Sequence, residues 1–189
     1  MIGRDTIDCM TKYVALFRGI NVGGKMVKMA ELVKTLEDLG YTQVKTLLNS
    51  GNAVFETDHH NQEYLIHEVE DRLEKVFGFH IDTLILPMSG LKSLVESDPF
   101  KNVSISPETR LYATFIFNKS IEPKSITIPY ESPEKDFRIL SVRHGAICSV
   151  LQLSSTRKTP DVMAMLEKEW GKKITTRSWN TVLKLASMA

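Results

Sequence analysis

The chain has 189 residues, of which 42% are apolar and 25% charged, and its formal net charge is +1. These values exclude collagen-like, fibrous and intrinsically disordered classes. Apolar runs such as residues 13–17 are far shorter than the ~20 residues of a membrane span, and the first ten residues lack the pattern of a secretory leader. Two cysteines, Cys9 and Cys148, are too few for a disulfide framework or a thiolate metal cage. We therefore expect a cytoplasmic globular protein without a metal, a cofactor or a membrane partner.

The net charge conceals a difference between the two halves of the chain. Residues 1–87 hold nine Lys and Arg against 13 Asp and Glu, whereas residues 88–189 hold 15 against ten. An acidic half and a basic half fit docking of one on the other, or a local anion site in the second. The balance gives only weak support to broad nucleic-acid binding, which usually involves a strongly basic domain.

The first half alternates strand and helix signals. A buried strand is predicted at residues 12–18, and the spacing of Leu32, Leu36 and Leu39 predicts a helix over 28–39 that ends at Gly40. Two strands, 42–48 and 53–57, flank a hairpin turn at 49–52. A helix at 61–77 and a strand at 82–86 complete the order βαββαβ.

The second half, residues 88–189, repeats this order more loosely. After a linker helix at 88–97, strands are predicted at 110–117, 135–143 and 146–153, with a hairpin at His144 and Gly145. We expect residues 118–133 to form either a short helix or an irregular crossover. A helix at 160–170 with Pro160 in its first turn, a strand at 173–178 and a helix at 180–188 follow. The fold class is therefore α+β, with two ferredoxin-like units, 1–87 and 88–189, each an antiparallel sheet with helices packed on it.

This topology gathers residues that are distant in the sequence. In a βαββαβ sheet the loop after the first strand lies at the same edge as the hairpin between the second and third strands. In the first unit that edge joins the loop at 18–25 to residues 48–52 and to the turn at 78–80. In the second unit residues 154–159 approach residues 176–179.

The loop RGINVGGK at 18–25 carries the clearest chemical pattern. Gly19, Gly24 and Lys25 have the spacing of a phosphate-binding loop between a strand and a helix. Met26, however, replaces the hydroxyl residue that holds magnesium, so we expect no nucleotide triphosphatase activity. Two interpretations stay open: a turn that lets the chain enter the helix, and a nest of backbone N–H groups that binds an anion.

Three motifs together carry a family resemblance: YVALFRGINVGGK-x-VKM-x-EL, LNSGNAVF and TTRSWNTVLKL. With them the chain resembles the bacterial family named domain of unknown function 1697, from about Tyr13 to Leu185. The resemblance implies an α+β fold of two ferredoxin-like units and no established activity, cofactor or substrate. Members usually have Asn at position 26 and often Gln at 48, where this chain has Met26 and Leu48.

The candidate ligand-binding residues come from both predicted edges. They are Arg18, Gly19, Asn21, Gly23, Gly24, Lys25, Asn49, Ser50, Asn52, Arg157, Arg177 and Trp179. Each has a structural alternative. The hairpin residues could satisfy their own turn, and Thr159 could cap a helix beside solvated charges. Arg177 could form an ordinary ion pair while Trp179 packs in a core.

The leading functional hypothesis is a module that binds a small anionic ligand, nucleotide-like or carrying phosphate or carboxylate, at the glycine-rich loop and a basic cleft. In it, Arg18 and Lys25 from one unit would surround the anion with Arg157 and Arg177 from the other. The first alternative is RNA binding through strand aromatics. The second is an enzyme with a composite site, for which the sequence offers no evident general base.

Overall fold

The structure is a computed structural model, and it describes residues 10–47, 51–118, 120–156 and 159–188. It is an α+β protein with one antiparallel sheet of four strands and another of five, so the predicted class is confirmed at this level. The chain divides into two compact units, an N-terminal unit that ends at Met88 and a C-terminal unit, Ser89–Met188. Within the described ranges, none of the helices is both long and apolar enough to cross a membrane.

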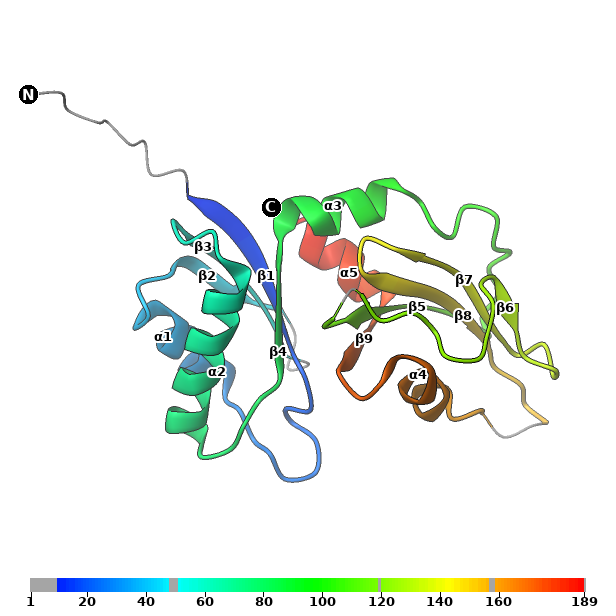
Figure 1. The fold of residues 1–189 in the computed structure, drawn as a ribbon, viewed down its shortest axis with the longest axis horizontal. Coiled ribbons are helices and arrows are strands. Elements are labelled where there is room, and N and C mark those ends of the chain that lie inside the picture. The colour runs from blue at the N-terminus through cyan, green and yellow to red at the C-terminus, as the bar shows by residue number, and fades with distance from the viewer. Residues whose placement is uncertain (1–9, 48–50, 119, 157–158, 189) are drawn as a thin grey trace, which may run out of the picture. The chain divides into compact units, whose positions relative to one another are not determined.

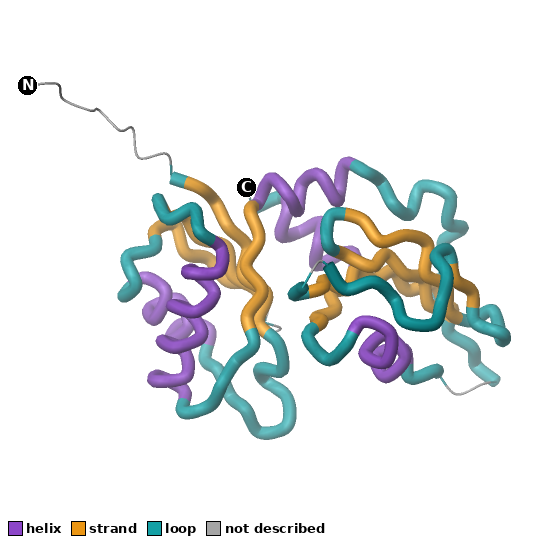
Figure 2. The backbone as a smooth tube through the Cα atoms, viewed as in Figure 1, coloured by secondary structure: helices purple, strands orange, loops and turns teal. Residues whose placement is uncertain are grey.

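The N-terminal unit has the element order that the sequence predicts. Its elements are β1 (Thr11–Phe17), α1 (Met29–Glu37), β2 (Thr42–Thr46), β3 (Asn52–Thr57), α2 (Gln62–Phe77) and β4 (Thr83–Pro87). The strands lie in the order β2-β3-β1-β4, and each neighbouring pair is antiparallel. Both helices cover the same face of this sheet (Figures 1 and 2). β1 is thus a central strand, consistent with its unbroken apolar run.

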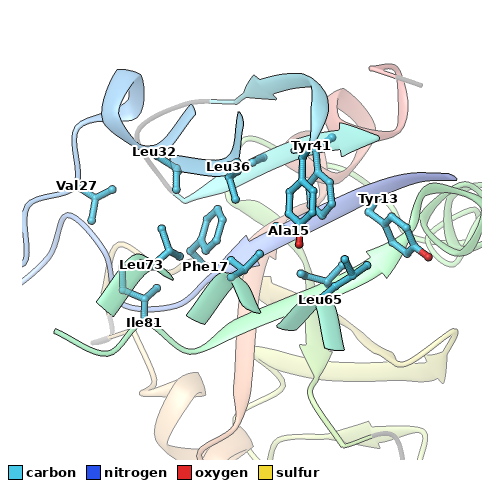
Figure 3. Packing of buried hydrophobic residues seen from close by; sticks show 14 of the residues in the cluster. Tyr13, Ala15, Phe17, Val27, Leu32, Leu36, Tyr41, Leu65, Leu73 and Ile81 are labelled. Carbon is cyan, nitrogen blue, oxygen red and sulfur yellow. The ribbon is translucent and has the colours of Figure 1, made fainter. Parts of the chain in front are cut away.

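The core of this unit lies between that face and the two helices. Every second residue of β1 enters it, because side chains alternate across a strand; these residues are Tyr13, Ala15 and Phe17. Helical spacing places Leu32 and Leu36 of α1 opposite them (Figure 3). The rings of Tyr41 and Phe55 stack with centroids 4.5 Å apart. This packing fixes the sheet edge on which the glycine-rich loop lies.

The C-terminal unit begins with a helix and ends with one. Its elements are α3 (Met88–Glu96), β5 (Thr109–Ile116), β6 (Tyr130–Glu131), β7 (Phe137–Arg143), β8 (Ala146–Gln152), α4 (Val162–Trp170), β9 (Ile174–Ser178) and α5 (Trp179–Ala186). The strand order is β6-β7-β8-β5-β9. Figure 1 shows α4 on one side of this sheet and α5 on the other. His144 and Gly145 both have positive φ, as the predicted β7–β8 hairpin requires.

The crossover from β5 to β6 is irregular. No helix forms in its described part, residues 118 and 120–129, so of the two predicted forms the irregular one is present. Ser125 holds it in place: its backbone N–H and its hydroxyl donate to the two carboxylate oxygens of Glu169 at 2.7 and 2.6 Å. Glu169 belongs to α4 and is only 3% exposed. These paired hydrogen bonds dock the crossover on α4.

The start of α4 differs from the prediction. The N-cap residue is Asp161, whose side chain accepts a hydrogen bond from the Ala164 backbone N–H at 3.0 Å. Pro160 therefore precedes the helix instead of lying in its first turn, and Thr159 does not cap it. Asp is among the best N-cap residues, so it outcompetes the threonine two positions earlier.

The Ser125–Glu169 pair should make the stability of the C-terminal unit acid-sensitive. The hydrogen bonds from Ser125 lower the pKa of Glu169, so the folded state favours its carboxylate. Their contribution is complete above the ordinary pKa of glutamate and disappears as the pH falls through the lowered folded value. In urea unfolding, Glu169→Gln should be less stable than the wild type at pH 7, and the difference should shrink at pH 3. Glu122→Gln, at an exposed position of the same crossover, is the control; an equal deficit for Glu169→Gln at both pH values would contradict the prediction.

Candidate functional site

Three segments of the N-terminal unit meet at the end of its sheet where β1 finishes. The Phe17 backbone N–H donates to the Gly51 carbonyl at 2.9 Å, which joins the end of β1 to the β2–β3 hairpin. The Arg18 N–H donates to the Asp82 carbonyl at 2.9 Å, which joins the same point to the segment before β4. The gathering that the topology predicts for this unit is confirmed.

The glycine-rich loop, residues 18–28, is closed by its own hydrogen bonds. The Asn21 N–H donates to the Lys25 carbonyl at 2.7 Å, and the Asn21 side-chain oxygen accepts from the Val27 N–H at 2.8 Å. Asn21 itself has φ of +56°, which asparagine tolerates better than most residues. Its side chain therefore shapes the loop, a role that the sequence analysis did not assign to it.

Gly23 and Gly24 form the exposed tip of this loop. Both have positive φ, +59° and +86°, and no atom lies within 4 Å of the position that a Cβ would occupy. Across the described chain, neither of their N–H groups has a hydrogen-bond acceptor. Successive backbone N–H groups in a turn can point toward a common anion. The tip thus offers donors in open space.

The surroundings of the tip add positive charge and apolar surface. The Lys25 ammonium lies 5.3 Å from the centroid of the Phe79 ring. The next helix, α1, has Lys28 as its N-cap residue, and no side chain caps its first N–H groups. Val22 and Met26 flank the glycines and are 62% and 74% exposed.

The polar hairpin residues divide into two groups. Asn52 is buried, and its side-chain amide donates to the Leu47 carbonyl at 3.1 Å, so it serves the hairpin backbone. This is the structural alternative that the sequence left open for it. Asn49 and Ser50 lie outside the described residues, and their role in binding stays a prediction.

The basic residues of the second predicted edge belong to the C-terminal unit. Arg177 on β9 is buried, and its Nη1 donates to the Thr175 hydroxyl at 2.8 Å and the Thr176 carbonyl at 2.9 Å. Burial lowers the pKa of its guanidinium to about 10. Trp179 packs edge-on against Phe100 with centroids 4.9 Å apart. Arg157 lies outside the described residues.

Sequence reasoning missed a more open basic site in this unit. Lys101, Arg138 and Arg143 line a cavity of about 300 Å³ together with Asp98. Lys101 and Arg143 are exposed, and Arg138 is half-buried. The positive charge of residues 88–189 was a signal for such a site, but these cations are far apart in the sequence and form no motif.

One group of side chains has the spacing of a metal site. Ligand atoms of Glu70, His80 and Asp82 lie within 4.8 Å of one another, and the search covers the described part of the chain alone. Both ring nitrogens of His80 already face carboxylates, Glu74 at 3.4 Å and Asp82 at 3.5 Å. One oxygen of Glu70 accepts the Thr83 N–H at 2.7 Å. These contacts within the protein explain why the three side chains lie close together, and no ion is needed to explain it.

Cys148 is buried on β8 as a free thiol. Burial raises its pKa to about 11, so at neutral pH it is protonated and a weak nucleophile.

Gly51 should be the least replaceable glycine at the loop edge. Its φ is +75°, and an added Cβ would lie 2.9 Å from Ile20 Cγ1 and 3.0 Å from the Phe17 carbonyl oxygen. Gly51→Ala should lower the free energy of unfolding by about 2 kcal/mol or more, because a clash adds to the left-handed strain. Gly40→Ala, with φ of +88° and open space, is the matched control and should cost about 1 kcal/mol. Equal losses in denaturant titrations would contradict the steric argument.

Cys148 should resist alkylation in the folded protein. In a Cys9→Ser background at pH 8, iodoacetamide should label Cys148 only after urea unfolding, because the native thiol is buried and protonated. Mass spectrometry of the intact protein measures the labelling. Native labelling at the rate of an exposed thiol would refute the assignment.

Comparison with known proteins places the chain. A search of curated proteins finds no match. A solved structure, described as that of the conserved bacterial protein SP0830 from Streptococcus pneumoniae, is similar with a TM-score of 0.71 and 25% identity, and the match covers 95% of this chain and 98% of that one. Residues 10–140, more than half of the chain, match the family described as protein of unknown function (DUF1697). The chain therefore belongs to the DUF1697 family, as its three sequence motifs predicted.

Proposed function

We propose that this protein binds a small anionic ligand, nucleotide-like or carrying phosphate or carboxylate, at the glycine-rich loop of its N-terminal unit. The observation that carries the proposal is the open tip at Gly23 and Gly24, where two left-handed residues leave their N–H groups without acceptors in the described chain. Such donors satisfy an anion that water would otherwise solvate, at little cost in backbone rearrangement.

The neighbours of the tip support the same ligand chemistry. Lys25 supplies a cation, and the uncapped start of α1 adds further N–H groups and the positive end of the helix dipole. The exposed Val22 and Met26 favour a ligand that carries apolar surface next to its anionic group. Met26 restricts the proposal to binding without phosphate hydrolysis. That Arg157 and Arg177 contribute to the same ligand stays a prediction.

We also infer that both units are variants of the ferredoxin-like arrangement. The order β2-β3-β1-β4 with helices after β1 and β3 supports this for the N-terminal unit. In the C-terminal unit β7-β8-β5-β9 has the corresponding order, with β6 added and the first helix replaced by the crossover.

The RNA alternative depends on strand aromatics, three of which are buried. Tyr13 and Phe17 of β1 and Phe115 of β5 are each only 2% exposed. Bases stack on rings that face solvent, so these three cannot form a stacking platform. Tyr112 and Phe117 of the predicted strand 110–117 are only partly exposed, which makes RNA binding the weaker alternative.

Calorimetric titration with inorganic pyrophosphate and with AMP tests the anion site. Gly24→Val should weaken binding about tenfold or more, because its side chain occupies the tip, and Lys25→Ala should do the same through loss of a charged contact. Gly40→Val, strained in the same way at the far end of α1, should leave the affinity unchanged.

Two outcomes would overturn the proposal. One is the absence of heat with both probes together with no anion retained by the purified protein in native mass spectrometry. The other is unchanged affinity in Gly24→Val and Lys25→Ala. A shallow dependence of affinity on salt is expected for one small anion, whereas a steep dependence with an oligonucleotide would favour nucleic acid.

A further inference from the structure

A second cavity, of about 300 Å³, lies in the C-terminal unit between the start of α4 and the strands β5, β8 and β9. Its residues come from segments that are distant in the sequence, with Asp161 from the loop before α4 and Thr176 from β9. No sequence motif marks it. Its volume lies at the lower end of the range for small-molecule sites.

The polar groups of this cavity are poorly satisfied. Ser149 is fully buried, and its hydroxyl has no hydrogen-bond partner in the described structure. The Thr176 hydroxyl donates to the Met163 sulfur at 3.1 Å, and a thioether is a weak acceptor. The Thr114 and Thr176 hydroxyls lie 2.7 Å apart. A buried hydroxyl without a good partner costs free energy, so this group of three would gain from a polar atom supplied by a ligand.

The walls of the cavity favour an apolar and uncharged body. Leu151 and Leu166 contribute aliphatic surface, and Met163 contributes a flexible thioether that packs well against aromatic rings. Among the described lining residues, Asp161 supplies the only carboxylate, and this group already accepts the Ala164 N–H as the helix cap. None of these described residues is a cation, so the lining as described favours an uncharged ligand.

We propose that this cavity binds a small, uncharged heteroaromatic molecule whose ring lies among Met163, Leu151 and Leu166 and whose ring nitrogen reaches the hydroxyls of Ser149 and Thr176. Displacement of the Met163 thioether would free the Thr176 hydroxyl for the ligand and open the way to Ser149. The site is separate in residues and in ligand chemistry from the anion site of the N-terminal unit, and neither proposal depends on the other.

A pair of probes tests the proposal on the intact chain: benzimidazole, with ring nitrogens, and indene, a hydrocarbon of nearly the same shape. Binding is followed by NMR at the Met163 methyl group, assigned through its loss in Met163→Leu. We expect a saturable shift with benzimidazole and weaker binding of indene. Ser149→Ala should lower the affinity for benzimidazole about five- to tenfold, because one hydrogen bond is lost, and should leave the affinity for indene unchanged.

Ser141→Ala is the matched control, since the Ser141 hydroxyl is also buried but lies outside the cavity; it should bind both probes like the wild type. If Ser149→Ala folds poorly, Thr176→Val can be used instead, because it also removes a hydroxyl from the cavity. The proposal is overturned if benzimidazole gives no saturable shift at Met163. It is also overturned if benzimidazole and indene bind equally, or if neither hydroxyl variant discriminates between them.

Discussion

The pairing of β1 with β3 on one side and β4 on the other is the constraint on which the N-terminal unit depends. It runs through the backbone of every residue of β1, and it ends in the bonds from Phe17 to Gly51 and from Arg18 to Asp82. Because the paired strands run in opposite directions, the end of β1 lies beside the start of both partners. The point where the chain enters the glycine-rich loop is therefore fixed by hydrogen bonds to two other segments, and the tip of the loop is left open.

The C-terminal unit differs from the N-terminal unit in how its first strand is connected to the next. Where the N-terminal unit covers its sheet with two helices on one face, this unit crosses from β5 to β6 in irregular chain held by the Ser125–Glu169 hydrogen bonds. A helix would have satisfied its own backbone and packed an apolar face. The crossover instead depends on a carboxylate that α4 brings to it, which ties the placement of α4 to the state of one acidic group.

The two candidate sites differ in the kind of unsatisfied group that each presents. At the loop tip, backbone N–H groups of Gly23 and Gly24 face open space, and their chemistry selects an anion. In the cavity under α4, hydroxyls of Ser149 and Thr176 lie beneath apolar walls, and their chemistry selects a neutral polar atom. Native proteins pair nearly all of their buried polar groups, so the buried Ser149 hydroxyl is an exception that is informative about function.

The sequence by itself determined the order of the elements in the N-terminal unit and the position of the glycine-rich loop, whereas β6 of the C-terminal unit was not predicted. Periodicity located β1, α1 and α2 to within a residue or two, and Gly40 and the pair His144–Gly145 marked a helix end and a turn, because these signals are local. Only the tertiary structure decided which polar residues are free to bind. Asn52 and Asn21 read as ligand residues, yet their amides are used by the hairpin and the loop. Ser149 carried no signal, because the burial that makes its hydroxyl significant comes from α4 and three strands, and such long-range packing leaves no pattern in the sequence around it.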